Sequence, residues 1–296
     1  MLDVVKSRNI WFVASGIIIA AALLMAIFFG LNPGIDFRGG SLSEIKFEQQ
    51  SPETSQIHEK IAGLDLGAVN IQKTDRGSYI IRSHELNQEQ HGALKDKLTA
   101  DFGNLNELKY ESIGPTISGE VTRRAFYQLI LVSLGILAYI AWAFRRVPRP
   151  LSSWWFGAAA IIALVHDLLI VIGVFALLGK LAQVEIDALF VTALLTVLGF
   201  SVHDTIIVFD RIRENLKKLT GETFSGVVSR SINQTLVRSI NTSTTVVFVL
   251  VALLLFGGES IRYFVLALLI GVAVGTYSSI FIASPLLYVF HRKKLS

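Results

Sequence analysis

Six long apolar runs constrain the fold of this 296-residue chain more than any other feature of its sequence. A helix needs about 20 apolar residues to cross a hydrocarbon core of about 30 Å, because it rises about 1.5 Å per residue. Hydrophobic residues make up 52% of the chain and are concentrated in these runs, which is too apolar for an ordinary soluble domain. The runs predict six membrane-spanning helices, near residues 10–30, 126–144, 154–178, 186–209, 240–257 and 263–290.

The first run has some features of a secretory signal, because Lys6 and Arg8 precede it. It is longer than the usual apolar region of a signal, and no small-residue cleavage site ends it. We therefore expect residues 1–31 to be retained as the first membrane-spanning helix.

Basic residues predict the orientation of these helices. The chain has no cysteine, and therefore no disulfide bond or thiolate metal site from which a compartment could be inferred. If the N terminus is cytoplasmic, fourteen Lys and Arg residues fall in inside segments, against only Lys180 and Arg262 in short outside loops. The positive-inside rule then places both termini in the cytoplasm. The inside residues are Lys6, Arg8, Arg145, Arg146, Arg149, Arg211, Arg213, Lys217, Lys218, Arg230, Arg238, Arg292, Lys293 and Lys294.

These loops also account for the net charge of +4, which is therefore no argument for nucleic-acid binding.

Residues 32–122 have the pattern of a folded extracytoplasmic domain, and residues 123–296 hold the remaining five spans with their cytoplasmic loops. The order βαββαβ is typical of a small ferredoxin-like α+β unit, with two helices on one face of a sheet. We find no paired carboxylates, His cluster or nucleophile arrangement in this domain, which favours an interaction or lever role. The expected strands are Leu42–Phe47, Ala68–Lys73, Tyr79–Arg82 and Leu108–Ile113, and the expected helices are Pro52–Ala62 and Gln88–Phe102.

A glycine-rich box, Gly34-Ile-Asp-Phe-Arg-Gly-Gly40, precedes the first expected strand. Glycines around an acid at a membrane exit predict a tight turn with close backbone packing, in which Asp36 caps local amides. Phosphate binding would need a lysine and a following helix, and the chain has no phosphate-binding loop motif elsewhere. The sequence therefore predicts neither a nucleotide cofactor nor enzymatic turnover.

The fourth run places His203 and Asp204 within the bilayer. It ends at the membrane surface with Asp210, Arg211 and Arg213. An ionised carboxylate inside hydrocarbon costs several kcal/mol, so such residues usually mark a pathway for ions or protons. A buried Asp can also lock two helices together through hydrogen bonds. His203 is expected to be a helix-packing partner rather than a relay, because it lies about 100° around the helix from Asp204.

The third run repeats this pattern more weakly, with His166 and Asp167. Asp167 is either a relay member or a structural tie to the fourth helix, and the structural interpretation is favoured because the sequence offers no cation beside it.

Small residues recur at every fourth position of the sixth run, a spacing that permits close helix packing, and Tyr277 is expected to add a polar contact. These small residues are Gly271, Gly275, Ser279 and Ala283. Ser225–Ser239, with apolar residues at helical spacing, predicts an interfacial helix or a partner-docking site before the fifth run.

Three motifs in this order and spacing resemble the SecF family, the smaller half of the SecD/SecF accessory complex of protein export, within the resistance-nodulation-division (RND) superfamily. They are the glycine box at 34–40, the helix-four motif Ser201–Asn215 and the helix-six motif Gly275–Pro285. The resemblance covers essentially the whole chain and implies an RND-type half bundle. Its structural motif residues are Gly34, Asp36, Phe37, Gly39, Gly40, Gly275, Tyr277 and Ser278.

The resemblance implies a bacterial inner-membrane protein that works with SecD and a SecYEG-type channel, and uses the proton-motive force to draw unfolded preproteins across the lipid bilayer. SecD would be a separate chain or the other half of a fusion. The helix-four acid that carries the proton corresponds to Asp204, and its helix-five arginine partner corresponds to Arg238. The outer domain, residues 41–114, would move and handle emerging substrate. No cofactor beyond the proton gradient is implied.

Position along the helices is compatible with that pairing. Asp204 lies six residues before Asp210, or about 9 Å below the cytoplasmic edge. Arg238 opens an antiparallel span whose first turns, Asn241–Thr245, are polar, so we expect the two side chains to meet at similar depth. Arg238 nearby favours the carboxylate anion, and separation favours proton uptake. Alternatively, Arg238 binds lipid phosphates at the membrane surface.

Two other functions fit parts of the pattern. An RND-type exporter of lipids or small molecules would share the charged fourth helix, although such exporters usually have two outer domains and about twelve spans. A passive scaffold of the translocation channel would need no titrating Asp204.

Overall fold

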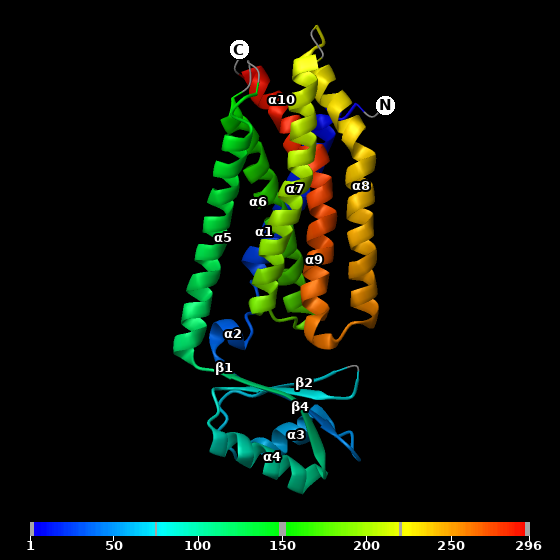
Figure 1. Ribbon diagram of the computed structural model, residues 1–296. Helices are drawn as coiled ribbons and strands as arrows, with labels where there is room; N and C mark the ends of the chain where they lie inside the picture. The colour runs from blue at the N-terminus through cyan, green and yellow to red at the C-terminus, as the bar shows by residue number, and fades with distance from the viewer. Residues whose placement is uncertain (1–2, 75, 148–151, 219–220, 294–296) are drawn as a thin grey trace. The chain divides into compact units, whose positions relative to one another are not determined.

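The computed structural model describes residues 3–74, 76–147, 152–218 and 221–293 (Figure 1). Arg149 and Lys294, two of the predicted inside residues, lie outside this described part. The chain forms two compact units. The first consists of Met1–Asn32 with Phe126–Ser296, and the second of Pro33–Ala125.

The first unit is a bundle of helices in which, among the described residues, six helical segments are long and apolar enough to cross a membrane. They occur at the six predicted runs, so the predicted class of membrane protein is confirmed. Ser225–Ser239 does not form a separate interfacial helix, because helical structure continues without a break into the fifth span. The helices are α1 Arg8–Phe29, α5 Pro115–Ala143, α6 Ser153–Ala182, α7 Ala188–Lys218, α8 Phe224–Phe256, α9 Glu259–Ser278 and α10 Ser284–Lys293, of which α5 begins within the second unit.

Helices α7 and α9 pack closely against each other in the bundle. A Cβ atom added at Gly275 would lie 2.9 Å from the Cβ atom of Ser201, and one added at Gly271 would collide with Val197. The pairs 197 with 271 and 201 with 275 keep a constant spacing, so the two helices run parallel. The predicted small-residue face is therefore a packing face, as in other membrane helix pairs.

The sixth span is not a continuous α-helix. A π-helical turn, η1 Ser279–Ala283, separates α9 from α10. Pro285 lacks an N–H group and cannot complete a normal hydrogen bond to the preceding turn. Ser284 Oγ donates instead to the carbonyl oxygen of Ser279 at 2.9 Å. The apolar periodicity of the run gave no sign of this wider turn.

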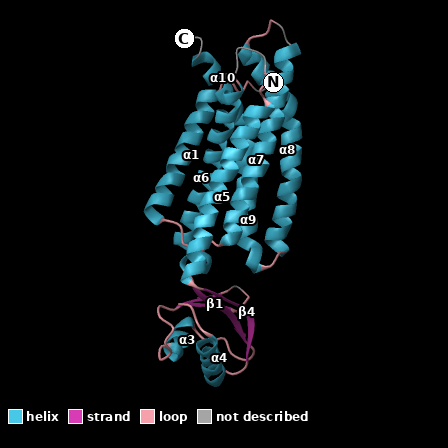
Figure 2. Ribbon diagram, turned by 60° about the vertical axis from the view of Figure 1, so that its left-hand side comes forward, coloured by secondary structure: helices cyan, strands magenta, loops and turns pink. Residues whose placement is uncertain are grey.

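The second unit is a four-stranded antiparallel sheet with strand order β2-β3-β1-β4, and two helices cover one face of it (Figure 2). The predicted βαββαβ order is confirmed. Ile45, Tyr79 and Ile81 on the strands pack against Ile57 and Leu94 on the helices. The elements are α2 Ile35–Arg38, β1 Gly40–Phe47, α3 Thr54–Ile61, β2 Asn70–Lys73, β3 Tyr79–Ser83, α4 Gln88–Phe102 and β4 Leu105–Ile113.

The glycine box forms the predicted tight turn. Helix α2 is a single turn, and the N–H group of Gly39 closes it by donating to the carbonyl oxygen of Ile35 at 2.8 Å. Gly39 and Gly40 have φ angles of +77° and +122°, which L side chains rarely adopt. A Cβ atom at Gly40 would lie 2.6 Å from the carbonyl oxygen of Ser83. The capping role expected of Asp36 stays a prediction.

Replacement of Gly40 by Ala should destabilise the sheet unit by about 1–3 kcal/mol, because it combines a strained φ with a backbone collision. Hydrogen–deuterium exchange of β1 and β3 in the intact protein measures the effect. Gly92→Ala is the matched control, since Gly92 lies inside α4 with no atom within 4 Å of an added Cβ, and it should raise stability by about 0.5–1 kcal/mol. Equal protection in the two variants would contradict the strained turn.

A polar cluster lies between α4 and β4 of the sheet unit. Glu107 accepts a hydrogen bond from Lys95 Nζ at 3.0 Å and one from Ser43 Oγ at 3.0 Å, and His91 Nε2 lies 2.7 Å from its Oε1 atom. Burial acts to raise the pKa of the Glu107 carboxyl, but these hydrogen bonds outweigh it and hold the pKa below its usual range.

The stability that Glu107 adds should therefore depend on pH. It is complete above the pKa of an unfolded glutamate, about 4.3, and is lost as the pH falls through the lower folded value. The difference in amide protection of β4 between wild type and Glu107→Gln should shrink below about pH 4. Glu111→Gln removes an exposed partner of Lys109 and should change little at any pH. A Glu107→Gln difference that is constant with pH would show that its charge is not responsible.

Candidate functional site

Helix α7 places Asp204 at its interface with α8 and α9. The residue is 1% exposed, and neither carboxylate oxygen has a hydrogen-bond partner in the part of the chain that the structure describes. The hydroxyls of Ser239 and Ser243 on α8 and of Thr276 on α9 lie close enough to act on its charge, as does His203 of α7. Asp204 therefore lies among hydroxyl groups and has no salt bridge to any described residue.

Two of these hydroxyls are already engaged with each other, since Ser243 Oγ and Thr276 Oγ1 are 2.5 Å apart. The Oγ atom of Ser239 is buried and lacks a partner among the described residues, as do the Asp204 oxygens. Leaving buried polar atoms unpaired costs free energy, and in native structures such sites are exceptional. The two carboxylate oxygens of Asp204 could therefore bind a proton, a cation or a hydrogen-bond donor.

The structure does not bring Arg238 to Asp204. Arg238 is exposed on α8, and it forms no ion pair with Asp204 within the described ranges. The two are at similar depth, because the neighbouring Ser239 faces Asp204, and this part of the prediction is right. Successive residues of a helix point about 100° apart, so Arg238 faces outward while Ser239 faces inward. The expected meeting of the two charges is not seen in this arrangement of helices, and the role of Arg238 as the partner of Asp204 stays a prediction.

His203 also lies on an exposed face of α7, between the buried residues Val202 and Asp204. The expectation that it packs between helices of this chain is wrong, because the same 100° step that separates it from Asp204 turns it away from α8 and α9.

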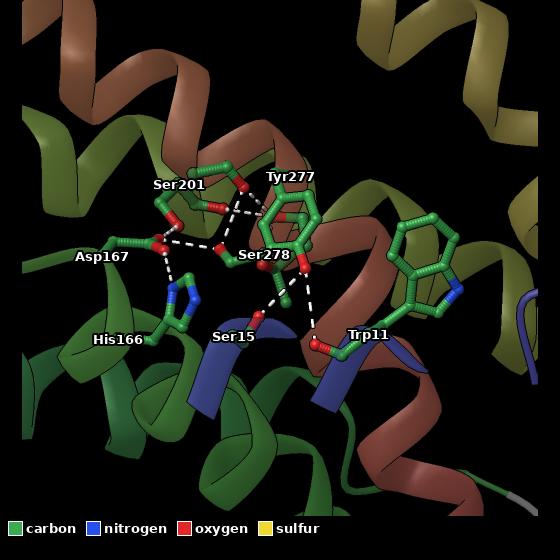
Figure 3. Close-up of polar contacts among 10 residues, drawn as sticks. Trp11, Ser15, His166, Asp167, Ser201, Tyr277 and Ser278 are labelled. Carbon is green, nitrogen blue, oxygen red and sulfur yellow. Dashed lines mark hydrogen bonds and ion pairs between the residues drawn. The ribbon is translucent and has the colours of Figure 1, made fainter. Parts of the chain in front are cut away.

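Asp167 on α6 is the centre of a second buried site (Figure 3). Its Oδ2 atom accepts hydrogen bonds from Ser201 Oγ at 2.6 Å and from Ser278 Oγ at 2.9 Å. Its Oδ1 atom lies 2.9 Å from Nδ1 of His166. One carboxylate thus joins α6 to α7 and to α9, which confirms the predicted tie to the fourth helix.

Tyr277 extends this network to α1. Its hydroxyl lies 3.0 Å from Ser15 Oγ and donates to the carbonyl oxygen of Trp11 at 3.5 Å. Its ring stacks on His166 at a centroid distance of 6.1 Å. Tyr277 therefore makes the polar contact expected of it, while Gly275 provides the close approach of α9 to Ser201.

Sequence reasoning missed most of the hydroxyl residues around the two acids. Ser201 was named only as the first residue of the helix-four motif and Ser239 only as the end of the segment before the fifth run, while Ser15 lies in one of the two most apolar of the described spans. A usable signal is the presence of Ser or Thr within apolar runs at helical spacing from an intramembrane acid. Within the described residues no group of three or more His, Asp or Glu side chains is arranged to hold a metal ion.

Six apolar helices with acids buried between them, and a small α+β domain inserted after the first helix, define a multi-pass membrane protein of the transport class. A family profile described as "Protein export membrane protein SecD/SecF, C-terminal" matches residues 93–293, and the "SecD/SecF GG Motif" matches residues 26–51. The chain belongs to the SecD/SecF family of protein export membrane proteins.

Relatives agree with this assignment over nearly the whole chain. "Protein translocase subunit SecF" of Thermobaculum terrenum is 46% identical, and the match covers 99% of this chain and 95% of the relative. The protein of the same name from Anaerolinea thermophila is 38% identical, with 98% and 94% covered.

A crystal structure of SecDF, described as a translocon-associated membrane protein from Thermus thermophilus, has the same fold. It matches with a TM-score of 0.84 and 33% identity, over 97% of this chain and 38% of the SecDF chain. The present chain thus spans about two fifths of the SecDF chain.

Replacement of Asp167 by Ala should lower the free energy of unfolding of the bundle by about 2 kcal/mol, since it removes three hydrogen bonds between or within buried helices. Asp167→Asn keeps part of the acceptor capacity and should cost less. Thr196→Ala is the control, because the Thr196 hydroxyl is exposed and bonds only to Thr192 of its own helix. Unfolding in mixed detergent measures the series, and Asp167→Ala behaving like Thr196→Ala would contradict a clamp.

Proposed function

We propose that this chain is an accessory subunit of the Sec translocase that works with a SecD half and uses the proton-motive force to promote protein export. Membership of the SecD/SecF family and near full-length similarity to SecF proteins support the subunit role. The SecDF chain of similar fold is much longer than this one, which supports a SecD half supplied by another chain or another part of a longer chain.

The unpartnered carboxylate of Asp204 carries the proton-coupling part of the proposal. An isolated ionised carboxylate inside a membrane protein is costly, and it becomes neutral by taking up a proton. The surrounding hydroxyls of α8 and α9 can solvate either form without supplying a fixed positive charge. A residue in this setting can gain and lose a proton as access to water changes.

In this proposal Arg238 causes Asp204 to release its proton. A rotation of α8 relative to α7 would replace Ser239 by Arg238 opposite Asp204, because the two residues are neighbours on the same helix. Arg238 beside Asp204 would favour the anion and release the proton. One charge that crosses a potential of about 100 mV supplies about 2.3 kcal/mol, enough to shift the balance between two helix arrangements.

The proposal places the chain in a bacterial inner membrane with both termini in the cytoplasm. The sheet unit would then be extracytoplasmic, where it can handle preprotein that leaves a SecYEG-type channel. The basic residues of the cytoplasmic segments support this orientation. Transport of this kind requires no catalytic residue, metal or organic cofactor.

A passive scaffold of the translocation channel is the main alternative, and it would leave Asp204 as a packing residue. Both unpartnered oxygens speak against that role, because a structural acid normally has hydrogen-bond donors, as Asp167 has. An exporter of lipids or small molecules is disfavoured by the match to SecF proteins along the whole chain.

Asp204→Asn should abolish the part of preprotein translocation that depends on the proton-motive force, because the amide cannot take up or release a proton. The assay is translocation into inverted vesicles that contain the SecD partner, at matched expression, with and without an uncoupler. ATP-driven translocation should continue in the variant.

Asp210→Asn is the matched control, since Asp210 is an exposed acid on the same helix that pairs with Arg213. It should retain force-dependent translocation. Full activity of Asp204→Asn would reject proton coupling at this residue and favour the scaffold.

A further inference from the structure

An exposed column of aromatic and basic side chains runs along the last turns of α5 and the turn that follows it. Tyr139 is 55% exposed and Trp142 is 60% exposed, and their ring centroids lie 6.3 Å apart. The guanidinium carbon of Arg145 lies over the Trp142 ring, 4.4 Å from its centroid, and Nη1 donates to the carbonyl oxygen of Trp142 at 2.8 Å. Arg146 is exposed as well. The column thus passes from aromatic rings to positive charge over about two helical turns.

This column faces away from the core of the helix bundle. Ile140 and Phe144 are buried and attach the end of α5 to the core, where Phe144 stacks on Phe156 of α6 at a centroid distance of 4.9 Å. Trp142 lies midway between them in sequence, about 200° around the helix axis, and therefore points outward. Helix α5 lies at the edge of the bundle (Figure 1). Because α5 is one of the apolar spans, the outward side of its end meets the headgroup region of a bilayer.

Acids of the chain do not compensate the charge of this column. Residues 121–166 contain no Asp or Glu. Neither Arg145 nor Arg146 forms an ion pair with any described residue. At the same end of the bundle, where Arg213 Nη1 donates to the carbonyl oxygen of Ala143, four basic residues of α7 and α8 instead pair with acids. These ion pairs are Arg211–Glu214, Arg213–Asp210, Lys218–Glu214 and Arg230–Glu222.

We infer that the column formed by Tyr139, Trp142, Arg145 and Arg146 binds the headgroup of an anionic phospholipid. Arginine suits a phosphate group, because its planar guanidinium can donate two parallel hydrogen bonds to phosphate oxygens. The Trp142 ring and carbonyl oxygen hold the Arg145 guanidinium in place, which lowers the entropy that binding costs. Tyr and Trp rings favour the membrane–water interface, where they can pack against the glycerol and upper acyl carbons of the same lipid.

Charge favours an anionic headgroup over a zwitterionic one. The phosphate of phosphatidylcholine is accompanied by a quaternary ammonium group, which two neighbouring uncompensated arginines repel. Phosphatidylglycerol carries the phosphate charge alone. Each basic residue at an anionic membrane surface strengthens binding by about fivefold, so the two arginines should give a preference of about tenfold or more.

Quenching of Trp142 fluorescence by brominated lipids tests the inference in the full chain reconstituted in bilayers. Trp11, Trp154 and Trp155 are replaced by Phe, so that Trp142 is the only tryptophan. Brominated phosphatidylglycerol or brominated phosphatidylcholine is then titrated into a phosphatidylcholine bilayer. We expect the anionic lipid to quench Trp142 at a mole fraction about tenfold lower. Equal quenching by the two lipids would overturn the inference and leave this face to unspecific lipid contact or to a protein partner.

Variants of the two arginines show whether the preference belongs to this column. Arg146→Gln should lower it by about fivefold, and the double variant Arg145→Gln/Arg146→Gln should remove it. Arg146→Gln keeps the contacts between Arg145 and Trp142, so a disturbed helix end does not account for its effect. Lys217→Gln removes an equal charge from an exposed position on α7 and should leave the preference unchanged. An equal decrease in Lys217→Gln would overturn the site in favour of general attraction to a basic protein surface.

Inorganic phosphate distinguishes a lipid site from a site for a free anion. At millimolar concentration it should leave the quenching by brominated phosphatidylglycerol unchanged, because a free ion makes no contact of glycerol or acyl carbons with the aromatic rings. Displacement of the lipid by phosphate would overturn the assignment to a phospholipid. No partner, preprotein or membrane potential is used, so a negative result here does not count against the proposed export function.

Discussion

The close contact between α7 and α9 is the interaction on which the rest of the bundle depends. Gly271 and Gly275 let the two backbones approach until no Cβ atom would fit between them and α7. Lipid chains are as apolar as leucine side chains, so close packing and hydrogen bonds, rather than hydrophobic burial, hold membrane helices together. The contact also determines which side chains of α7 and α9 remain free to face α6 on one side and α8 on the other.

The two intramembrane acids occupy these two sides and are treated differently. Asp167 receives hydrogen bonds from residues of three helices, whereas neither oxygen of Asp204 has a donor among the residues that the structure describes. The side of the α7–α9 pair toward α6 thus contains a hydrogen-bonded acid, and the side toward α8 contains an acid whose oxygens lack partners among the described residues.

Much of this could be predicted from the sequence. Apolar runs located the six spans, alternation located the strands, and the cost of a buried charge singled out Asp204 and Asp167. The directions of Arg238 and His203 could not be predicted, because they depend on which face of each helix meets a neighbour. The Ser and Thr residues near the two acids could not be identified for a related reason. Such residues are common in membrane helices, and only tertiary packing determines which of them lie beside an acid.

The π turn at Ser279–Ala283 affects how the end of the sixth span is oriented. Such a turn contains an extra residue without an extra revolution, so every side chain after it is offset around the axis by about 100° from its place in a continuous α-helix. A helical wheel drawn through the whole span would therefore assign α10 to the wrong side. The shift lets one span present Gly275 to α7 and still bury Leu287 in the core at its far end. Deletion of one residue from the turn should therefore rotate all side chains of α10 about the helix axis by about 100°, while those of α9 keep their directions.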